Sequence, residues 1–211
     1  MAEKKTQQSE GKPRPVRMTG AERRAQIIDV VLRLVHEHGV GGTTTARIAR
    51  TAGVTEPTLY QYFQSRRDML LAGVDAVFER TREVLESSDE ADVVERLRRI
   101  GAYHTRETAA KRLRFIDPLF EFMVAPRSEG LRDRVRAGNL ETLSFIASLV
   151  EEGKKQGRIR ANVDAKRVAW KMMSFYWFED VSSLMDIDEV VSEGISTEIL
   201  EAALADTVAK P

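Results

Sequence analysis

The chain has 211 residues, enough for one large domain or for a small domain joined to a larger one. Its composition, 42% hydrophobic and 31% charged, is typical of a globular protein, and no apolar run approaches the roughly 20 residues that a membrane span needs. Cysteine is absent, which excludes disulfides and thiolate metal sites, and the polar N-terminus lacks the apolar core of a secretory signal, so we expect a cytoplasmic protein.

The zero net charge of the chain hides an asymmetry between its ends. Residues 1–70 hold 12 Lys and Arg against 7 Asp and Glu, whereas residues 71–211 hold 21 against 26. The N-terminal third therefore carries a net charge of +5 and the remainder −5. This imbalance is either ordinary fluctuation or a sign that the N-terminal part meets an anionic partner.

The first predicted elements are a flexible basic arm over residues 1–18 and a helix that follows it. Thr19 and Glu22 have the spacing of a capping box, in which each side chain bonds a free backbone N–H of the first turn. Apolar residues then recur with helical period, and Gly39 ends the helix.

Two short helices are predicted next, roughly over residues 44–52 and 56–62, with Gly53 at the turn between them. Thr55 is a good N-cap for the second one, and Pro57 is tolerated in its first turn. A helix of about seven residues is unstable alone, so it must pack its apolar residues onto its neighbours.

The rest of the chain is predicted to be helical as well. Ser65 starts a longer helix. The segment that contains Pro118 is expected to kink or break there, and Gly138-Asn139 is expected to weaken its long helix similarly. The further segments lie near 90–109, 111–125, 129–156, 165–185 and 195–209, with starts suggested by Asp89, Ser128, Asp164 and Ser196. No alternating strand pattern occurs, so the predicted fold class is all-α.

The second short helix turns polar groups outward while its apolar residues pack. Hydroxyls, an amide and a helix N-terminus are groups that bond phosphates and base edges. Two helices joined by a tight turn, the second presenting such groups, describe a helix-turn-helix in which the second helix reads DNA.

Residues 23–70 resemble the N-terminal DNA-binding domain of TetR-family transcriptional regulators. The residues that carry the resemblance are Ile27/Ile28, Gly39, Thr44, Ile48-Ala49, Ala52-Gly53-Val54, Pro57-Thr58-Leu59-Tyr60, Tyr62-Phe63, Ser65-Arg66 and Leu70. The resemblance implies a helix-turn-helix domain over residues 19–66 and a larger helical domain over 67–211 that binds an effector and dimerises.

The same resemblance implies roles for individual residues. It implies that phosphates are contacted by Thr45, Tyr60, Tyr62 and Arg66. It implies that base edges are faced by Thr55, Glu56, Pro57, Thr58 and Gln61. Where members often have an acidic residue before Ile48, this chain has Arg47, which either adds a phosphate contact or is solvated. Glu56 either caps its helix or accepts from cytosine. The predicted DNA-binding residues are Thr44, Thr45, Arg47, Thr55, Glu56, Pro57, Thr58, Tyr60, Gln61, Tyr62 and Arg66.

Catalytic chemistry finds little support in the sequence. The histidines His36 and His38 lie two residues apart and so on different faces of a helix, which does not suit a shared metal. There is no Gly-rich phosphate loop, no GxSxG and no HExxH. We expect no catalytic residue, no metal and no cofactor.

Aromatic residues and methionines gather around Pro118 and in one later helix. Such residues are either plain core or the lining of a pocket for an apolar or aromatic effector, held by one or two hydrogen bonds. The candidate ligand-binding residues are Tyr103, His104, Phe115, Leu119, Phe120, Met123, Trp170, Met173, Tyr176 and Trp177.

The leading hypothesis is a homodimeric repressor that binds double-stranded DNA at a palindromic operator and leaves it when a small ligand binds. The alternatives are a DNA-binding regulator without a small effector, and a helical enzyme or binding module. In the family the last two long helices form the dimer. The apolar residues expected there are Val168, Val181, Leu184, Ile199, Leu200, Ala203 and Leu204.

Overall fold

A computed structural model describes residues 18–87, 90–110, 116–187, 195–205 and 207–208. The described chain is helical except for turns and a single bridge between Ile159 and Val208, so the all-α prediction is confirmed. Its elements are α1 (Gly20–Gly42), α2 (Thr45–Ala52), α3 (Glu56–Leu59), α4 (Arg66–Glu86), α5 (Val93–Ala109), α6 (Pro118–Val124), the 3₁₀ turn η1 (Arg127–Glu129), α7 (Leu131–Lys155), α8 (Ala165–Leu184) and α10 (Ile195–Ala205).

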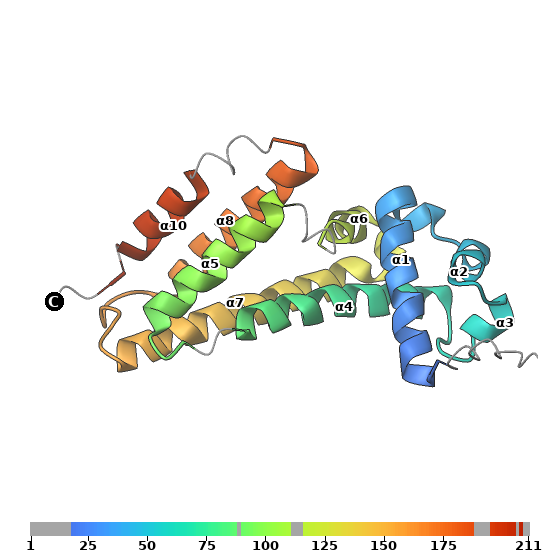
Figure 1. The fold of residues 1–211 in the computed structure, drawn as a ribbon, viewed down its shortest axis with the longest axis horizontal. Coiled ribbons are helices and arrows are strands. Elements are labelled where there is room, and N and C mark those ends of the chain that lie inside the picture. Colours follow the sequence, from blue (N-terminus) through green and yellow to red (C-terminus); the bar gives the residue numbers. More distant parts are fainter. Residues whose placement is uncertain (1–17, 88–89, 111–115, 188–194, 206, 209–211) are drawn as a thin grey trace, which may run out of the picture.

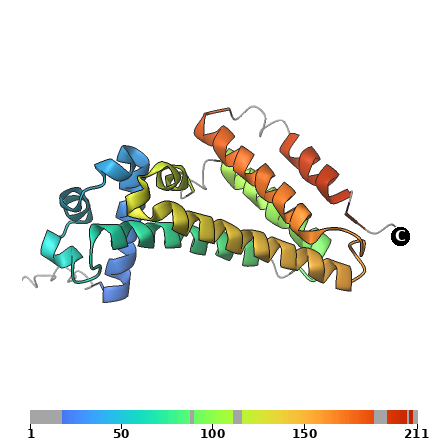
Figure 2. The same cartoon turned by 180° about the vertical axis from the view of Figure 1, so that it is seen from behind.

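The helices form an elongated molecule (Figure 1). The first three helices lie at one end, and α5, α8 and α10 lie at the other. The long helices α4 and α7 run between the two ends, and Figure 2 shows the same arrangement from behind. None of the described helices is long and apolar enough to cross a membrane.

Several predicted helix starts are confirmed because they depend on local hydrogen bonds. Thr19 and Glu22 form the complete capping box of α1. Ser65 accepts from the N–H of Asp68 at the start of α4, and Asp164 accepts from two backbone N–H groups at the start of α8. Gly39 interrupts α1 with a positive φ of 66°, although the chain makes one more turn before it leaves the helix.

Other boundaries differ from the prediction. Helix α5 begins after Asp92, which accepts from the N–H groups of Val94 and Glu95, whereas Asp89 lies outside the described residues. Of the kink or break expected at Pro118, the described residues show a break, because residues 116–117 are not helical and α6 begins at Pro118, where the missing N–H has no helical partner. Helix α7 begins at Leu131, three residues after Ser128, which lies in η1. Ser196 lies inside α10, which begins at Ile195.

The expectation that Gly138-Asn139 weakens its helix was wrong, because α7 is continuous from Leu131 to Lys155. Gly138 is buried where α7 crosses α4, and a Cβ there would overlap the ring of Phe78. The glycine therefore allows a close approach of two helices instead of breaking one.

Two separate apolar cores fill the molecule. The first joins α1–α3 to the start of α4, to α6 and to the start of α7, with Leu70, Phe122 and Leu131 among its buried members. The second lies between α5, α7, α8 and α10, with Leu97 and Leu204 among its buried members. The first core thus extends past residue 66, the predicted end of the N-terminal domain, because α6 and α7 also pack against it.

Candidate nucleic-acid interface and ligand cavity

The short helices α2 and α3 are joined as the sequence predicts. Gly53 ends α2 in the left-handed conformation with a φ of 67°, and Thr55 caps α3 by accepting from the N–H of Thr58. The hydroxyls of Thr55 and Thr58 lie 2.8 Å apart. Helix α3 is shorter than expected, because regular helix ends at Leu59 and turns follow it.

Most of the predicted DNA-contacting side chains of this helix are exposed. Glu56, Pro57, Gln61 and Tyr60 are exposed, the last by half of its surface. Tyr62 is half-buried and packs against the first core, so only part of its ring is accessible. An outward polar face next to an apolar inner face is what a helix that reads another molecule needs.

The predicted DNA-contacting residues near the start of α2 differ in their exposure and in their hydrogen bonds within the protein. Thr44 caps α2 by accepting from the N–H of Arg47, and its side chain remains exposed. Thr45 is half-buried. The Arg47 guanidinium donates from Nη1 to the carbonyl of Gly42 at 2.8 Å, so it is anchored to the end of α1.

Arg66 has partners inside the protein on all three guanidinium nitrogens. Nε donates to the carbonyl of Thr43 at 2.7 Å, Nη1 pairs with Glu129 at 3.0 Å, and Nη2 donates to the carbonyl of Val40. The side chain thus joins the end of α1 to η1. No local sequence pattern indicates this role, because Glu129 lies 63 positions further along the chain.

A cavity of about 70 Å³ lies between the long helices α4 and α7 and the helices α5 and α8. The start of α6 also borders it. Five of the predicted ligand-binding residues line it, and they are His104, Leu119, Met173, Tyr176 and Trp177. The remaining lining residues are Phe78, Thr81, Val84, Leu85, Ile100, Ile116, Asn139, Thr142, Ile146 and Asp180.

Four of the other five predicted ligand-binding residues lie away from this cavity. Tyr103 borders a shallow outer depression, where Arg106 lies over its ring. Trp170 is 65% exposed on the outer side of α8. Phe120 meets the edge of Trp177 with ring centres 5.3 Å apart, and Met123 packs on the first core. Phe115 lies outside the described residues.

The cavity wall on α4 and α7 was missed by the sequence reasoning. The α4 members repeat with helical period, and such a stripe predicts burial without telling a packed interior from a hollow one. The position of Asp180 in the cavity wall could have been predicted, because it lies three residues after Trp177 and therefore on nearly the same face of α8.

One end of the cavity is polar. His104 on α5 stands between two carboxylates of α8, with Nδ1 at 2.8 Å from Glu179 and Nε2 at 3.3 Å from Asp180. Thr105 donates its hydroxyl to the other oxygen of Glu179 at 2.7 Å. Burial alone would lower the pKa of His104, but hydrogen bonds to Asp180 and Glu179 raise it to about 9, so the ring is protonated at neutral pH.

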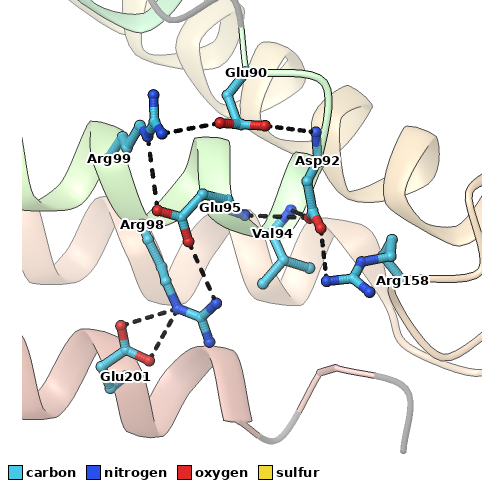
Figure 3. Close-up of polar contacts among 8 residues, drawn as sticks. All are labelled: Glu90, Asp92, Val94, Glu95, Arg98, Arg99, Arg158 and Glu201. Carbon is cyan, nitrogen blue, oxygen red and sulfur yellow. Dashed lines mark hydrogen bonds and ion pairs between the residues drawn. The ribbon is translucent and has the colours of Figure 1, made fainter. Parts of the chain in front are cut away.

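A second cluster of charges lies where α5 meets α10 (Figure 3). Arg98 pairs with Glu95 and Glu201, and Asp92 pairs with Arg158 beyond the end of α7. Most of these side chains are substantially exposed, and none of them lines the cavity described above. Exposed pairs stabilise a fold weakly, so we interpret this cluster as structural.

Large apolar side chains are exposed on the outer side of α8. Trp170, Phe178 and Leu184 are 65%, 62% and 44% exposed. Three residues predicted to form a dimer surface are instead buried inside the chain, and these are Val168, Leu200 and Leu204. Leu200 lies against Gly101 of α5, which shows that α10 packs on its own chain.

The bacterial regulatory proteins of the tetR family have a family model that matches residues 27–72. The HTH-type transcriptional regulator TtgR of Pseudomonas putida is 27% identical over 199 residues, covering 87% of this chain and 94% of its own.

Two solved structures resemble the fold at full length. One is a TetR transcriptional regulator from Chloroflexus aurantiacus, with a TM-score of 0.76 at 22% identity, covering 90% of this chain and 98% of its own. The other is the regulator FadR from Bacillus subtilis in complex with stearoyl-CoA, with a TM-score of 0.68 at 22% identity, covering 85% and 97%.

Proposed function

Because the chain belongs to the TetR family of transcriptional regulators, we propose that it is a dimeric cytoplasmic repressor. In this proposal a small, largely apolar ligand releases it from a palindromic operator. The observation that carries the proposal is the path of α4, which begins directly after the DNA-reading turn and later forms a wall of the ligand cavity.

The proposed DNA-binding residues remain those that the sequence implies. Thr55, Glu56, Pro57, Thr58 and Gln61 contact base edges, and Thr45, Tyr60, Tyr62 and Arg66 contact phosphates. Thr44 and Arg47 also belong to the proposed DNA-binding set, without an assigned group on the DNA. The exposure of Thr44, Glu56, Pro57, Tyr60 and Gln61 supports a role in DNA contact, because these side chains are accessible before any DNA binds.

The small volume of the cavity supports a ligand-dependent change. Ligand sites usually occupy about 300–1,000 Å³, whereas this cavity holds about 70 Å³. A ligand of ordinary size must therefore move the helices that form the cavity walls apart. One of these helices is α4, whose first residue follows the turn after α3, the proposed DNA-reading helix. The shift in DNA binding is limited by the difference in the affinities of the ligand for the two arrangements.

The test starts with selection of bound duplexes from random DNA, which should give a palindrome with half-sites one helical turn or more apart. Gln61→Ala should then relax base preference at one position of each half-site, lowering affinity for the selected operator by about 5- to 150-fold. Mobility shift on operators that differ at that position measures the effect.

Gln64→Ala is the matched control, because Gln64 is also exposed but lies beyond the proposed base-reading residues. It should leave the base preference unchanged. The proposed placement of the reader is contradicted when both variants alter the preference equally or when neither does. A chain that binds no selected duplex contradicts the proposed function itself.

A further inference from the structure

The polar end of the cavity carries a net negative charge. Protonated His104 supplies one positive charge, and Glu179 and Asp180 supply two negative charges. The Glu179 side chain is only 2% exposed and that of Asp180 13%. Among the described residues, no Lys or Arg lines the cavity, so one negative charge has no compensating cation there.

The two carboxylates differ in how far their bonding capacity is used. Glu179 accepts from His104 and from Thr105, one bond on each oxygen. Asp180 pairs with His104 through one oxygen only, and it is the carboxylate that lines the cavity. The uncompensated charge therefore lies on the cavity side of the cluster. A charge held away from water is costly unless an opposite charge reaches it.

The Tyr176 hydroxyl is an independent observation at the same end. Tyr176 lines the cavity and its ring centre lies 4.6 Å from that of His104. Its hydroxyl oxygen is buried and has no hydrogen-bond partner within the described part of the chain. A buried polar atom without a partner costs free energy, and a donor on a ligand would remove that cost.

The remaining walls suit the rest of such a ligand. Phe78 and Trp177 present aromatic rings, and Leu119 and Ile146 add aliphatic surface. Aromatic faces attract a nearby cation as well as apolar groups. The cavity thus combines an apolar body with an electronegative end.

We propose that the effector is an apolar or aromatic molecule that carries a protonated amine, and that the amine donates to Asp180 and to the Tyr176 oxygen. This inference rests on the proposed role of the cavity as the effector site. An anionic ligand would place a second uncompensated charge beside Asp180. A wholly apolar ligand would leave the Tyr176 hydroxyl without a partner and the net negative charge of the cluster without a cation.

The test compares three probes that share one skeleton and differ in a single group. Phenethylamine carries an ammonium, phenethyl alcohol a hydroxyl and propylbenzene a methyl group. Trp177 lines the cavity, so its fluorescence reports binding. We expect phenethylamine to bind about tenfold or more tightly than either neutral probe at neutral pH. It should also release the selected operator at the lowest concentration.

The variant Asp180→Asn keeps the shape of the side chain and removes its charge, so the preference for phenethylamine should disappear. Asp180→Glu restores the charge and should restore most of the preference. Asp133→Asn makes the same chemical change at an exposed position outside the cavity lining and should change nothing. Circular dichroism and operator binding without probe show whether each variant is folded.

Each outcome decides the inference. Equal binding of phenethylamine and phenethyl alcohol overturns it, because hydrogen bonding rather than charge would then govern recognition. Tightest binding of propylbenzene, or no binding of any probe, overturns it as well. In each of these three cases the unchanged protein still binds its operator without a probe, so the proposed DNA-binding function stands. Loss of operator binding in the absence of probe would instead contradict the proposed function.

Discussion

Arg66 stands at the first position of α4, next to the turn that is proposed to read DNA, and bonds three groups of its own chain. Two of its partners are the carbonyls of Val40 and Thr43 at the end of α1, and the third is Glu129. A guanidinium has five N–H groups, so three internal bonds leave donors for a phosphate. A structural role and a DNA contact are therefore compatible in one side chain.

We predict that Arg66→Ala lowers the free energy of unfolding by about 2 kcal/mol, because the Thr43 carbonyl loses its donor and the Val40 carbonyl keeps only the N–H of Thr43. The pair with Glu129 adds little, since both side chains are about one quarter exposed and screened by solvent. Urea denaturation measures the loss. If Arg66 also contacts phosphate, the salt dependence of operator binding should fall by about one unit.

Arg67→Ala is the control for this prediction. Arg67 is exposed and donates from Nε to the carbonyl of Glu129 at 2.8 Å, a single bond near the surface. Its removal should cost clearly less stability than the removal of Arg66. Equal stability of the unchanged protein and Arg66→Ala would contradict the role given to the internal bonds.

At the scale of whole elements, the crossing of α4 and α7 depends on a glycine. Gly138 lies against the Phe78 ring, and Phe78 also lines the cavity. Gly138→Ala raises helix propensity, which alone would stabilise α7 by about 1 kcal/mol. The added methyl group overlaps the ring, and overpacking costs about 1–3 kcal/mol. We expect a net loss of about 1 kcal/mol in the free energy of unfolding.

The matched control is Gly41→Ala near the end of α1. A Cβ at Gly41 meets nothing within 4 Å, and the residue does not have a positive φ. Thermal or urea unfolding should therefore show this variant to be at least as stable as the unchanged protein. A stabilised Gly138→Ala variant would show that the two helices can separate without cost.

The same elements show what the sequence could predict. The caps at Thr19, Ser65 and Asp164 were correct, because a cap depends on residues two or three positions apart. The prediction for Gly138 was wrong because the glycine makes room for the ring of Phe78, which lies on another helix and 60 residues earlier in the chain. Local patterns predict where a helix lies but not which helix crosses it.

The candidate sites also differ in how far local sequence patterns could predict them. The outward residues of α3 could be predicted, because a short helix with one apolar side leaves the other side exposed. The cavity could be predicted only in part, because α4, α5, α7 and α8 together enclose it. The pairing of His104 with Glu179 joins residues 75 positions apart and has no local signal.

At the scale of the whole molecule, the exposed apolar side of α8 bears on the proposed dimer. Trp170 and Phe178 are eight residues apart, so they lie on the same face of α8. Ile199 of α10 is also half exposed. Large apolar side chains gathered on one side of a protein mark an interaction surface, and a second copy of the chain is the occupant that we propose.

We predict that Phe178→Glu yields folded monomers, because a charge on this face opposes its burial against a partner. Sedimentation at micromolar concentration should show the unchanged chain at twice the monomer mass and the variant at the monomer mass. A monomer engages one half-site only, so operator affinity should fall by on the order of a hundredfold.

Two further substitutions separate this effect from damage to the fold. Val124→Glu places the same charge at an exposed position on α6 and should leave the dimer intact. Leu200→Glu should unfold the chain and not merely divide the dimer, because Leu200 is 4% exposed and packs against Gly101. Circular dichroism distinguishes the two results. If Phe178→Glu stays dimeric while Leu200→Glu gives folded monomers, the interface lies on α10, and the exposed face of α8 faces solvent.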